Sequence, residues 1–316
     1  MTGAVLVTGA NGFVGMALCR YLLAQGRRVV GAVRDPGAAL PACVERCIVP
    51  EIGPDTDWNQ ALSGVGIVVH LAARVHVPGS GNGEALEEFR RVNAYGAATL
   101  ARAAANRCIQ RFIFISSVKV LGDENSDGSS YVDTDIPLPV DAYGRSKLEG
   151  EEAVAAVSQG GMTAVILRPP LVYGPGVRAN FLAFLGLCDT AMPLPLGGID
   201  NRRSLLALDN LVAAIAYVLD QPGAAGGRYL LKDGEDLSIG DLAARLRKAL
   251  GRSERIWQAP PRLLGALNRI GPLSPRLKRL TGSLTVDDRG IRALGFAPPI
   301  GVDEGLARVA RWWRAR

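Results

Sequence analysis

The chain has 316 residues, of which 48% are hydrophobic and 21% charged, so it can bury a sizeable core in one large or two interleaved domains. Its net charge of +6 comes from scattered basic residues with few aromatic residues between them, which argues against a nucleic-acid partner. Five cysteines without a CxxC pair, and only two histidines, indicate neither a disulfide framework nor a metal site.

Strands and helices alternate through the first half of the chain. Apolar runs predict buried strands at residues 4–9, 28–34, 66–72, 111–117 and 163–169, and helical patterns fall between them at 13–25, 58–62, 84–106 and 142–158. This alternation predicts an α/β fold with a doubly wound parallel Rossmann sheet.

The pattern changes after residue 168. Loops rich in proline and glycine are followed by a helix that opens at Asp209, a strand near 228–232 and a helix at 238–250. We therefore expect a Rossmann domain at 1–173 and 205–230, and a smaller mixed α/β domain at 174–204 and 231–316. Residues 260–280 are alternately apolar and basic, which fits a lid, a dimer face or an amphipathic surface segment.

The stretch TGANGFVG places Gly9, Gly12 and Gly15 between the first strand and the first helix. Backbone amides and the positive end of a helix attract a pyrophosphate at such a turn. A three-glycine pattern alone is weak, but this position makes it a strong indication of a dinucleotide cofactor.

The end of the second strand bears on the choice of cofactor. A site that prefers NAD normally has an acidic residue there, whereas this sequence has Val33 and then Arg34. A guanidinium group can pair with a 2′-phosphate, so the sequence favours NADP(H). Asp35 follows directly, which keeps NAD(H) possible, and Glu51 at the end of the third strand is either near the adenine or a solvated surface residue.

Tyr143 and Lys147 are four residues apart and share one face of a predicted helix. A neighbouring ammonium group favours the phenolate form of a tyrosine, which is otherwise a poor proton donor or acceptor at pH 7. Ser117 ends the fourth predicted strand, where its hydroxyl could orient a substrate oxygen.

These motifs, with HLAA at 70–73, YGRSK at 143–147, RPPLVYGPG at 168–176 and RRSLLALDNL at 202–211, resemble the extended short-chain dehydrogenase/reductase family over essentially the whole chain. The resemblance implies that Ser117, Tyr143 and Lys147 are catalytic. It implies the following cofactor-binding residues: Gly9, Asn11, Gly12, Phe13, Val14, Gly15, Arg34, Glu51, Ile52, Leu71, Ala72, Ala73, Asn93, Tyr143, Lys147 and Pro170.

The resemblance also implies a nucleotide-sugar substrate, bound by the smaller domain. The candidate substrate-binding residues are His76, Ser116, Ser117, Lys119, Asn180, Arg203 and Arg279. Arg203 matches the position at which such enzymes pair an arginine with the diphosphate, and Lys119 either contacts substrate or points to solvent. His76 is either a hydrogen-bond donor to substrate or a packed loop residue.

Two departures from the family pattern reduce the number of reactions that the chain is expected to catalyse. Sugar dehydratases of the family carry Asp and Glu after the serine, where this chain has Val118 and Lys119, so a 4,6-dehydratase is not expected. Leu171 replaces the asparagine with which UDP-galactose 4-epimerases bind the substrate diphosphate.

The stretches SSVKV, RPPLVYGPGVRANF, LPLGGIDNRRSL and DGEDLS, with the Pro-rich basic segment, resemble bacterial reductases that convert UDP-4-keto-6-deoxy-N-acetylglucosamine to UDP-N-acetylquinovosamine. The resemblance implies a product used for surface polysaccharide. The alternatives are a UDP-hexose or UDP-N-acetylhexosamine 4-epimerase with tightly bound NAD and, more remotely, a non-catalytic NADP-sensing protein. No apolar run reaches the roughly 18 residues of a membrane span, so we expect a cytoplasmic protein. Helices 84–106 and 142–158 could form a homodimer or pack internally.

Overall fold

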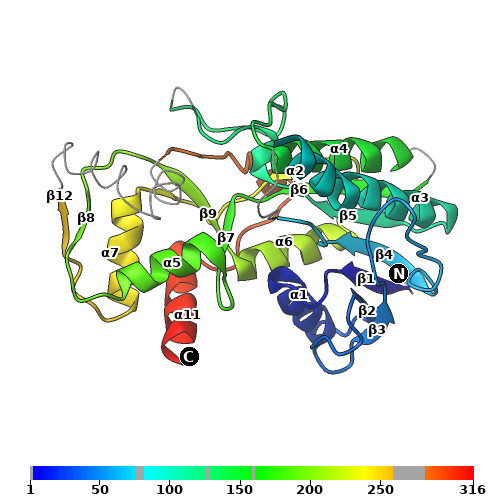
Figure 1. Ribbon diagram of the computed structural model, residues 1–316, viewed down its shortest axis with the longest axis horizontal. Helices are drawn as coiled ribbons and strands as arrows, with labels where there is room; N and C mark the ends of the chain where they lie inside the picture. The colour runs from blue at the N-terminus through cyan, green and yellow to red at the C-terminus, as the bar shows by residue number, and fades with distance from the viewer. Residues whose placement is uncertain (1–2, 76–81, 126–127, 159–160, 259–281) are drawn as a thin grey trace.

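The computed structural model describes residues 3–75, 82–125, 128–158, 161–258 and 282–316. A parallel sheet of seven strands, in the order β10, β6, β5, β4, β1, β2, β3, forms the larger part of the molecule (Figure 1). Its strands are β1 (Ala4–Thr8), β2 (Val29–Val33), β3 (Glu45–Ile48), β4 (Val65–His70), β5 (Arg111–Ile115), β6 (Thr163–Arg168) and β10 (Arg228–Leu230). The predicted Rossmann-type α/β fold is therefore confirmed.

Both faces of this sheet are buried, which is why its strands are apolar runs. Val5 and Val7 of β1 face a core that includes α1 (Phe13–Ala24) and α6 (Leu208–Asp220). Ala4 and Leu6, which point the other way, face α3 (Ala97–Asn106) and α4 (Ala142–Val157). Figure 1 shows the two helical layers on opposite sides of the sheet.

Three local predictions need correction. Residues 58–62 form turns, because the segment is too short to sustain a helix and the Asp57 carboxylate accepts a hydrogen bond from the Asn59 amide. The edge strand β3 was not among the predicted runs, since its first two residues are exposed. The single helix expected at 84–106 consists of α2 (Asn82–Arg90), a π-helix η1 (Arg91–Gly96) and α3.

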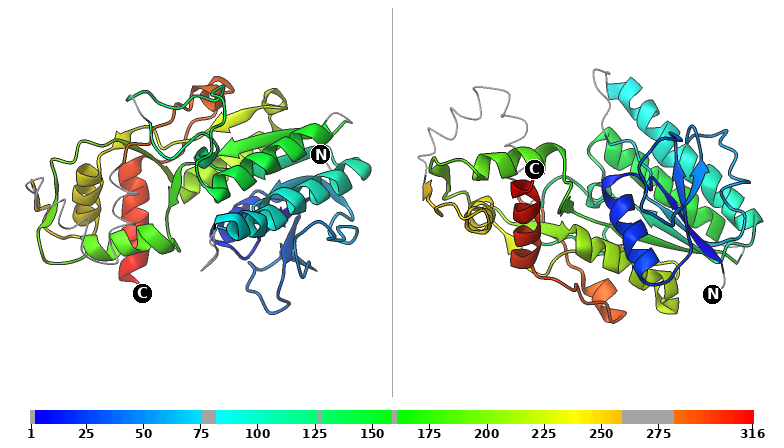
Figure 2. Two further views of the ribbon diagram at one scale, coloured as in Figure 1. Left: turned by 45° about the horizontal axis from the view of Figure 1, so that its top comes forward. Right: turned by 90° about the horizontal axis from the view of Figure 1, so that it is seen from below.

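The smaller part contains two minor sheets. One has the order β11 (Asp236–Leu237), β9 (Arg203–Ala207), β7 (Leu171–Tyr173), and the other pairs β12 (Ile256–Gln258) with β8 (Leu194–Gly197). Its helices are α5 (Ala179–Cys188), α7 (Ile239–Ala249) and α11 (Val302–Arg314). Helix α10 (Arg289–Ala293) packs on the larger part, where Ile291 joins the core, and short 3-10 turns η2 (Val118–Val120) and η4 (Pro222–Ala224) lie elsewhere. Figure 2 shows α11 in the smaller part, away from the N-terminus.

The core of the smaller part explains its helices. Residues of α5, α7 and α11 contribute to one apolar cluster with β8 and β9. The sequence indicated α7 but gave no expectation for α5 or α11. The exact domain boundaries stay a prediction. Within the described residues, no helix is long and apolar enough to cross a bilayer.

Candidate functional site

The turn between β1 and α1 has the geometry of a phosphate cradle. Gly9 has a φ of +65°, and a Cβ atom on Gly15 would lie 2.2 Å from the Gly9 carbonyl oxygen. Only glycine permits both features. Helix α1 begins after Gly12 without a side-chain cap, so its first amides face outward unsatisfied. These residues fit a dinucleotide pyrophosphate.

Thr8 ties this cradle to the loop that follows β4. Its hydroxyl accepts hydrogen bonds from the Leu71 and Ala72 amides at 3.2 and 3.1 Å and lies 2.9 Å from His70 Nδ1. Burial, with the nearby charge of Lys147, lowers the pKa of His70 to about 3. Because the Thr8 hydroxyl already accepts two amide hydrogen bonds, its own proton is available for Nδ1 of the neutral ring. Thr8 was not among the predicted site residues, and its only signal in the sequence is its place before the first glycine.

Asn93 lies in the π-helix η1 and fixes the same loop from the other side. Its Oδ1 accepts a hydrogen bond from the Arg74 amide at 2.8 Å, and its Nδ2 donates to the Arg74 carbonyl at 3.0 Å and to Ser146 Oγ at 3.0 Å. Asn93 is fully buried. It therefore holds the loop beside the predicted cofactor site and joins η1 to α4.

Ser117 and Tyr143 meet above the carboxyl end of β5. The Ser117 hydroxyl accepts a hydrogen bond from the Lys119 amide at 3.2 Å and lies close enough to the Tyr143 hydroxyl to act on its pKa. Burial, together with the nearby charge of Asp141, raises the pKa of Tyr143 to about 12, while the neighbouring Ser117 hydroxyl opposes the rise. The Phe89 ring packs edge-on against Tyr143 at 6.0 Å.

Lys147 lies one helical turn beyond Tyr143 and is buried. Its ammonium group is 4.1 Å from the centre of the Phe114 ring, and Phe114 also stacks on His70 at 5.8 Å. Burial lowers the pKa of Lys147 to about 7, while the charge of Glu151 opposes this change. The lysine can therefore gain or lose a proton near neutral pH.

A buried ion pair supports this face of α4 and was not anticipated. Arg168 Nε and Nη2 donate to the two Glu151 oxygens at 2.9 and 2.7 Å, and both side chains are almost fully buried. Arg228 Nε lies 3.6 Å from the same carboxylate. Glu151 falls four residues after Lys147, so helical spacing was the available signal.

Lys119 occupies a place that the sequence did not suggest. Its Nζ donates to Asp123 Oδ1 at 2.7 Å and to Asp141 Oδ2 at 2.6 Å. The ammonium group is thus directed to two carboxylates rather than simply to solvent. Its contact with a substrate stays a prediction.

Some residues at the predicted adenosine position have an ion-pair or hydrogen-bond partner in the described structure, and others have none. Glu51 forms an ion pair with Arg91 at 3.1 Å, and the Asp35 Oδ1 accepts a hydrogen bond from the Gly37 amide at 2.8 Å. Arg34 is exposed, and no ion pair to it is found among the described residues. Ile52 packs beside η1, where a Cβ on Gly96 would lie 2.6 Å from Ile52 Cγ2.

The predicted substrate residues are only partly assembled. Arg203 donates one hydrogen bond, from Nη1 to the Gly282 carbonyl at 2.7 Å, while its Nε is buried without a partner in the described structure. Burial lowers the pKa of Arg203. Asn180 is half-buried in the first turn of α5.

Two further placements complete the predicted set. Ser116 is buried with its hydroxyl unpartnered in the described structure, and Pro170 is buried between β6 and β7. His76 and Arg279 lie outside the described residues.

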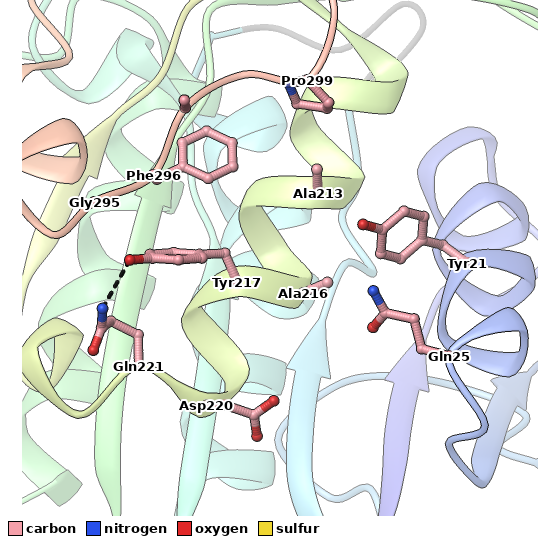
Figure 3. A pocket seen from close by; sticks show the side chains of 11 residues that line it. Tyr21, Gln25, Ala213, Ala216, Tyr217, Asp220, Gln221, Gly295, Phe296 and Pro299 are labelled. Atoms are coloured by element: carbon pink, nitrogen blue, oxygen red, sulfur yellow. Dashed lines mark hydrogen bonds between the residues drawn. The ribbon is translucent and has the colours of Figure 1, made fainter.

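A cavity of about 670 Å³ lies elsewhere, between α1, α6 and residues 295–299 (Figure 3). Tyr21 and Gln25 of α1 face α6 across it, and Tyr217 accepts a hydrogen bond from Gln221 at 2.8 Å. Asp220, its only carboxylate, is paired with Arg27. Because α1 and α6 cover the sheet face opposite α4, this cavity is separate from the site around Tyr143.

Comparisons with known proteins agree with this arrangement. A UDP-glucose 4-epimerase of Vibrio cholerae is 36% identical over 322 aligned residues, covering 98% of this chain and 95% of that protein. The 2-alkyl-3-oxoalkanoate reductase of Stenotrophomonas maltophilia is 25% identical, covering 96% and 98%. The UDP-glucuronic acid 4-epimerase of Bacillus cereus, solved with NAD, shares the fold with a TM-score of 0.76 over 99% of each chain at 23% identity. Residues 5–234 match the NAD dependent epimerase/dehydratase family, and this chain belongs to that family.

Proposed function

We propose that this chain is an NADPH-dependent reductase of the C4 keto group of a UDP-4-keto-6-deoxy-N-acetylhexosamine, giving UDP-N-acetylquinovosamine. The observation that carries the proposal is the meeting of Ser117 and Tyr143 above the sheet, with Lys147 on the same helix face, at the end where the phosphate cradle lies. Such a product fits surface polysaccharide synthesis in the cytoplasm.

The turn with Gly9, Gly12 and Gly15 would hold the cofactor, and a reduced nicotinamide bound there would supply a hydride for C4 of the sugar. Tyr143 gives its hydroxyl proton to the C4 oxygen, so the carbonyl becomes an alcohol and the phenol becomes a phenolate. Ser117 donates a hydrogen bond that stabilises the charge on these oxygens. Lys147, buried beneath them, stabilises the phenolate by charge and can return a proton to it.

The smaller part is proposed to hold the UDP-sugar. Arg203 has a buried donor without a partner in the described structure, which a substrate phosphate would satisfy. Asn180 lies at the first turn of α5 and is proposed to contact the same phosphates. We propose the domain boundaries 1–173 with 205–230 for the cofactor, and 174–204 with 231–316 for the nucleotide sugar.

The second candidate is a UDP-hexose or UDP-N-acetylhexosamine 4-epimerase with tightly held NAD. The 36% identity to an epimerase over nearly the whole chain favours it. The same three side chains serve this reaction, because removal of a C4 hydride requires Tyr143 to accept the proton. A dehydratase is disfavoured, since Val118 is buried and Lys119 is paired with two aspartates.

The two candidates differ in cofactor turnover. The purified protein, incubated with UDP-4-keto-6-deoxy-N-acetylglucosamine, is expected to consume one NADPH for each sugar reduced, measured by loss of absorbance. Conversion of UDP-glucose or UDP-N-acetylglucosamine to its C4 epimer without net change in the nicotinamide would instead establish the epimerase.

The choice between NADPH and NADH is expected to depend on Arg34. Asp35 is held in a turn by Gly37, which leaves Arg34 as the group free to pair with a 2′-phosphate. Arg34→Ala should lower kcat/KM for NADPH by about 10- to 100-fold and change that for NADH little. Arg20→Ala, an exposed arginine on the second half of α1, is the matched control. An equal loss with both cofactors would refute the assignment.

A further inference from the structure

Lys119 connects the two segments that carry Ser117 and Tyr143. It lies two residues after Ser117, and its Nζ is 2.6 Å from Asp141 Oδ2, two residues before Tyr143. We propose that Lys119 is a positioning residue, whose ion pair with Asp141 fixes the Ser117 loop against the first turn of α4 and sets the charge beside Tyr143. This inference rests on the proposed roles of Ser117 and Tyr143.

The backbone reinforces the same junction. Asp141 is the N-cap of α4, because its Oδ1 accepts a hydrogen bond from the Gly144 amide at 2.7 Å. A Cβ atom on Gly144 would lie 2.5 Å from the Lys119 carbonyl oxygen. Helix α4 can approach the loop this closely only because position 144 is a glycine. One carboxylate therefore both caps the helix and holds the lysine of the adjoining loop.

The second partner of Lys119 makes the arrangement testable. Asp123 Oδ1 lies 2.7 Å from Nζ but belongs to the same loop as the lysine, so it joins nothing to α4. The Lys119 and Asp141 side chains are 29% and 37% exposed, and ion pairs of that exposure contribute little to the stability of a whole fold. Loss of this ion pair should therefore change the kinetics of the site and leave the free energy of unfolding nearly unchanged.

The charges that face Tyr143 can be enumerated within the described structure. Asp141 and Lys147 lie on α4, and Lys119 comes from the loop after β5. From α2, the Phe89 ring touches Tyr143 and carries no charge. The arginine beside that ring, Arg90, is paired with Glu149. Burial and the Asp141 charge raise the pKa of Tyr143. Lys119 is the cation that pairs directly with Asp141.

Two substitutions should shift the pH dependence in opposite directions. In Lys119→Met the Asp141 charge acts unopposed, so Tyr143 should keep its proton to higher pH. Asp141→Asn retains the N-cap but removes the anion, so Tyr143 should lose its proton at lower pH. We expect the tyrosine limb of kcat/KM to move by about half a pH unit each way. Lys119→Met should also lower kcat about 10-fold with little change in KM.

Controls separate this inference from the proposed function. Asp123→Asn, which removes the partner that stays within the loop, should leave the limb and kcat unchanged, and Lys119→Arg should restore most of the activity. Unchanged profiles in Lys119→Met and Asp141→Asn, or shifts in one direction, would overturn the positioning role alone. Full turnover in Tyr143→Phe would instead refute the proposed function, on which the positioning role rests.

Discussion

Tyr143→Phe is expected to reduce turnover by about 10³-fold while cofactor binding stays within twofold. The substitution removes the hydroxyl that lies beside Ser117 and is proposed to give its proton to the substrate, and it leaves the phosphate cradle untouched. The measurement is kcat with the keto sugar, together with the dissociation constant of NADPH from fluorescence titration.

A matched control is available on the opposite face of the sheet. Tyr21 is 38% exposed on α1 and lines the cavity there, so Tyr21→Phe should keep full activity. If Tyr143→Phe bound cofactor normally and also retained turnover, Tyr143 would not be the proton donor. Normal cofactor binding without turnover in the parent protein would instead indicate a nicotinamide-binding sensor.

Glu151→Gln is expected to cost about 3 to 5 kcal/mol of unfolding free energy. Glu151 is the charge partner of buried Arg168, and the substitution leaves that guanidinium without its carboxylate. It also removes the charge that keeps the pKa of Lys147 from falling further, so less of the lysine would be protonated at neutral pH. Urea denaturation of the variant and of the parent measures the first effect.

The next residue of the same helix provides the control. Glu152 is exposed, so Glu152→Gln should change stability by less than about 0.5 kcal/mol. If Glu151→Gln does not fold, the double variant Glu151→Met with Arg168→Met should recover folding, because an apolar pair carries no desolvation cost. A stability of Glu151→Gln close to that of Glu152→Gln would contradict the argument.

Features that depend on neighbours in sequence were predictable. Contiguous apolar runs identified five strands, and the glycine spacing predicted the tight turn between β1 and α1. Its role as a phosphate cradle stays a prediction. The relation of Tyr143 to Lys147 followed from helical spacing. Each of these signals is contained in fewer than ten residues.

Features that depend on distant segments were not predictable. Thr8 meets His70 across 62 positions, and Lys119 meets Asp141 across 22, so neither pair leaves a local pattern. The edge strand β3 was missed because its first two residues are exposed and leave no apolar run, although pairing with the distant β2 makes it a strand. The segment 58–62 was misread because an apolar pattern of five residues does not sustain a helix.

The π-helix η1 has a consequence for how this chain tolerates insertions and deletions. The wider π-helical turn changes the angular position of the side chains between α2 and α3, so the two helices do not continue the same 3.6-residue periodicity. Deleting one residue here would restore regular winding while rotating Asn93 away from the Arg74 backbone that it clamps. The helix would then be regular but would no longer hold the loop at Arg74. The number of residues in η1 is therefore constrained, even where its exposed side chains are free to vary.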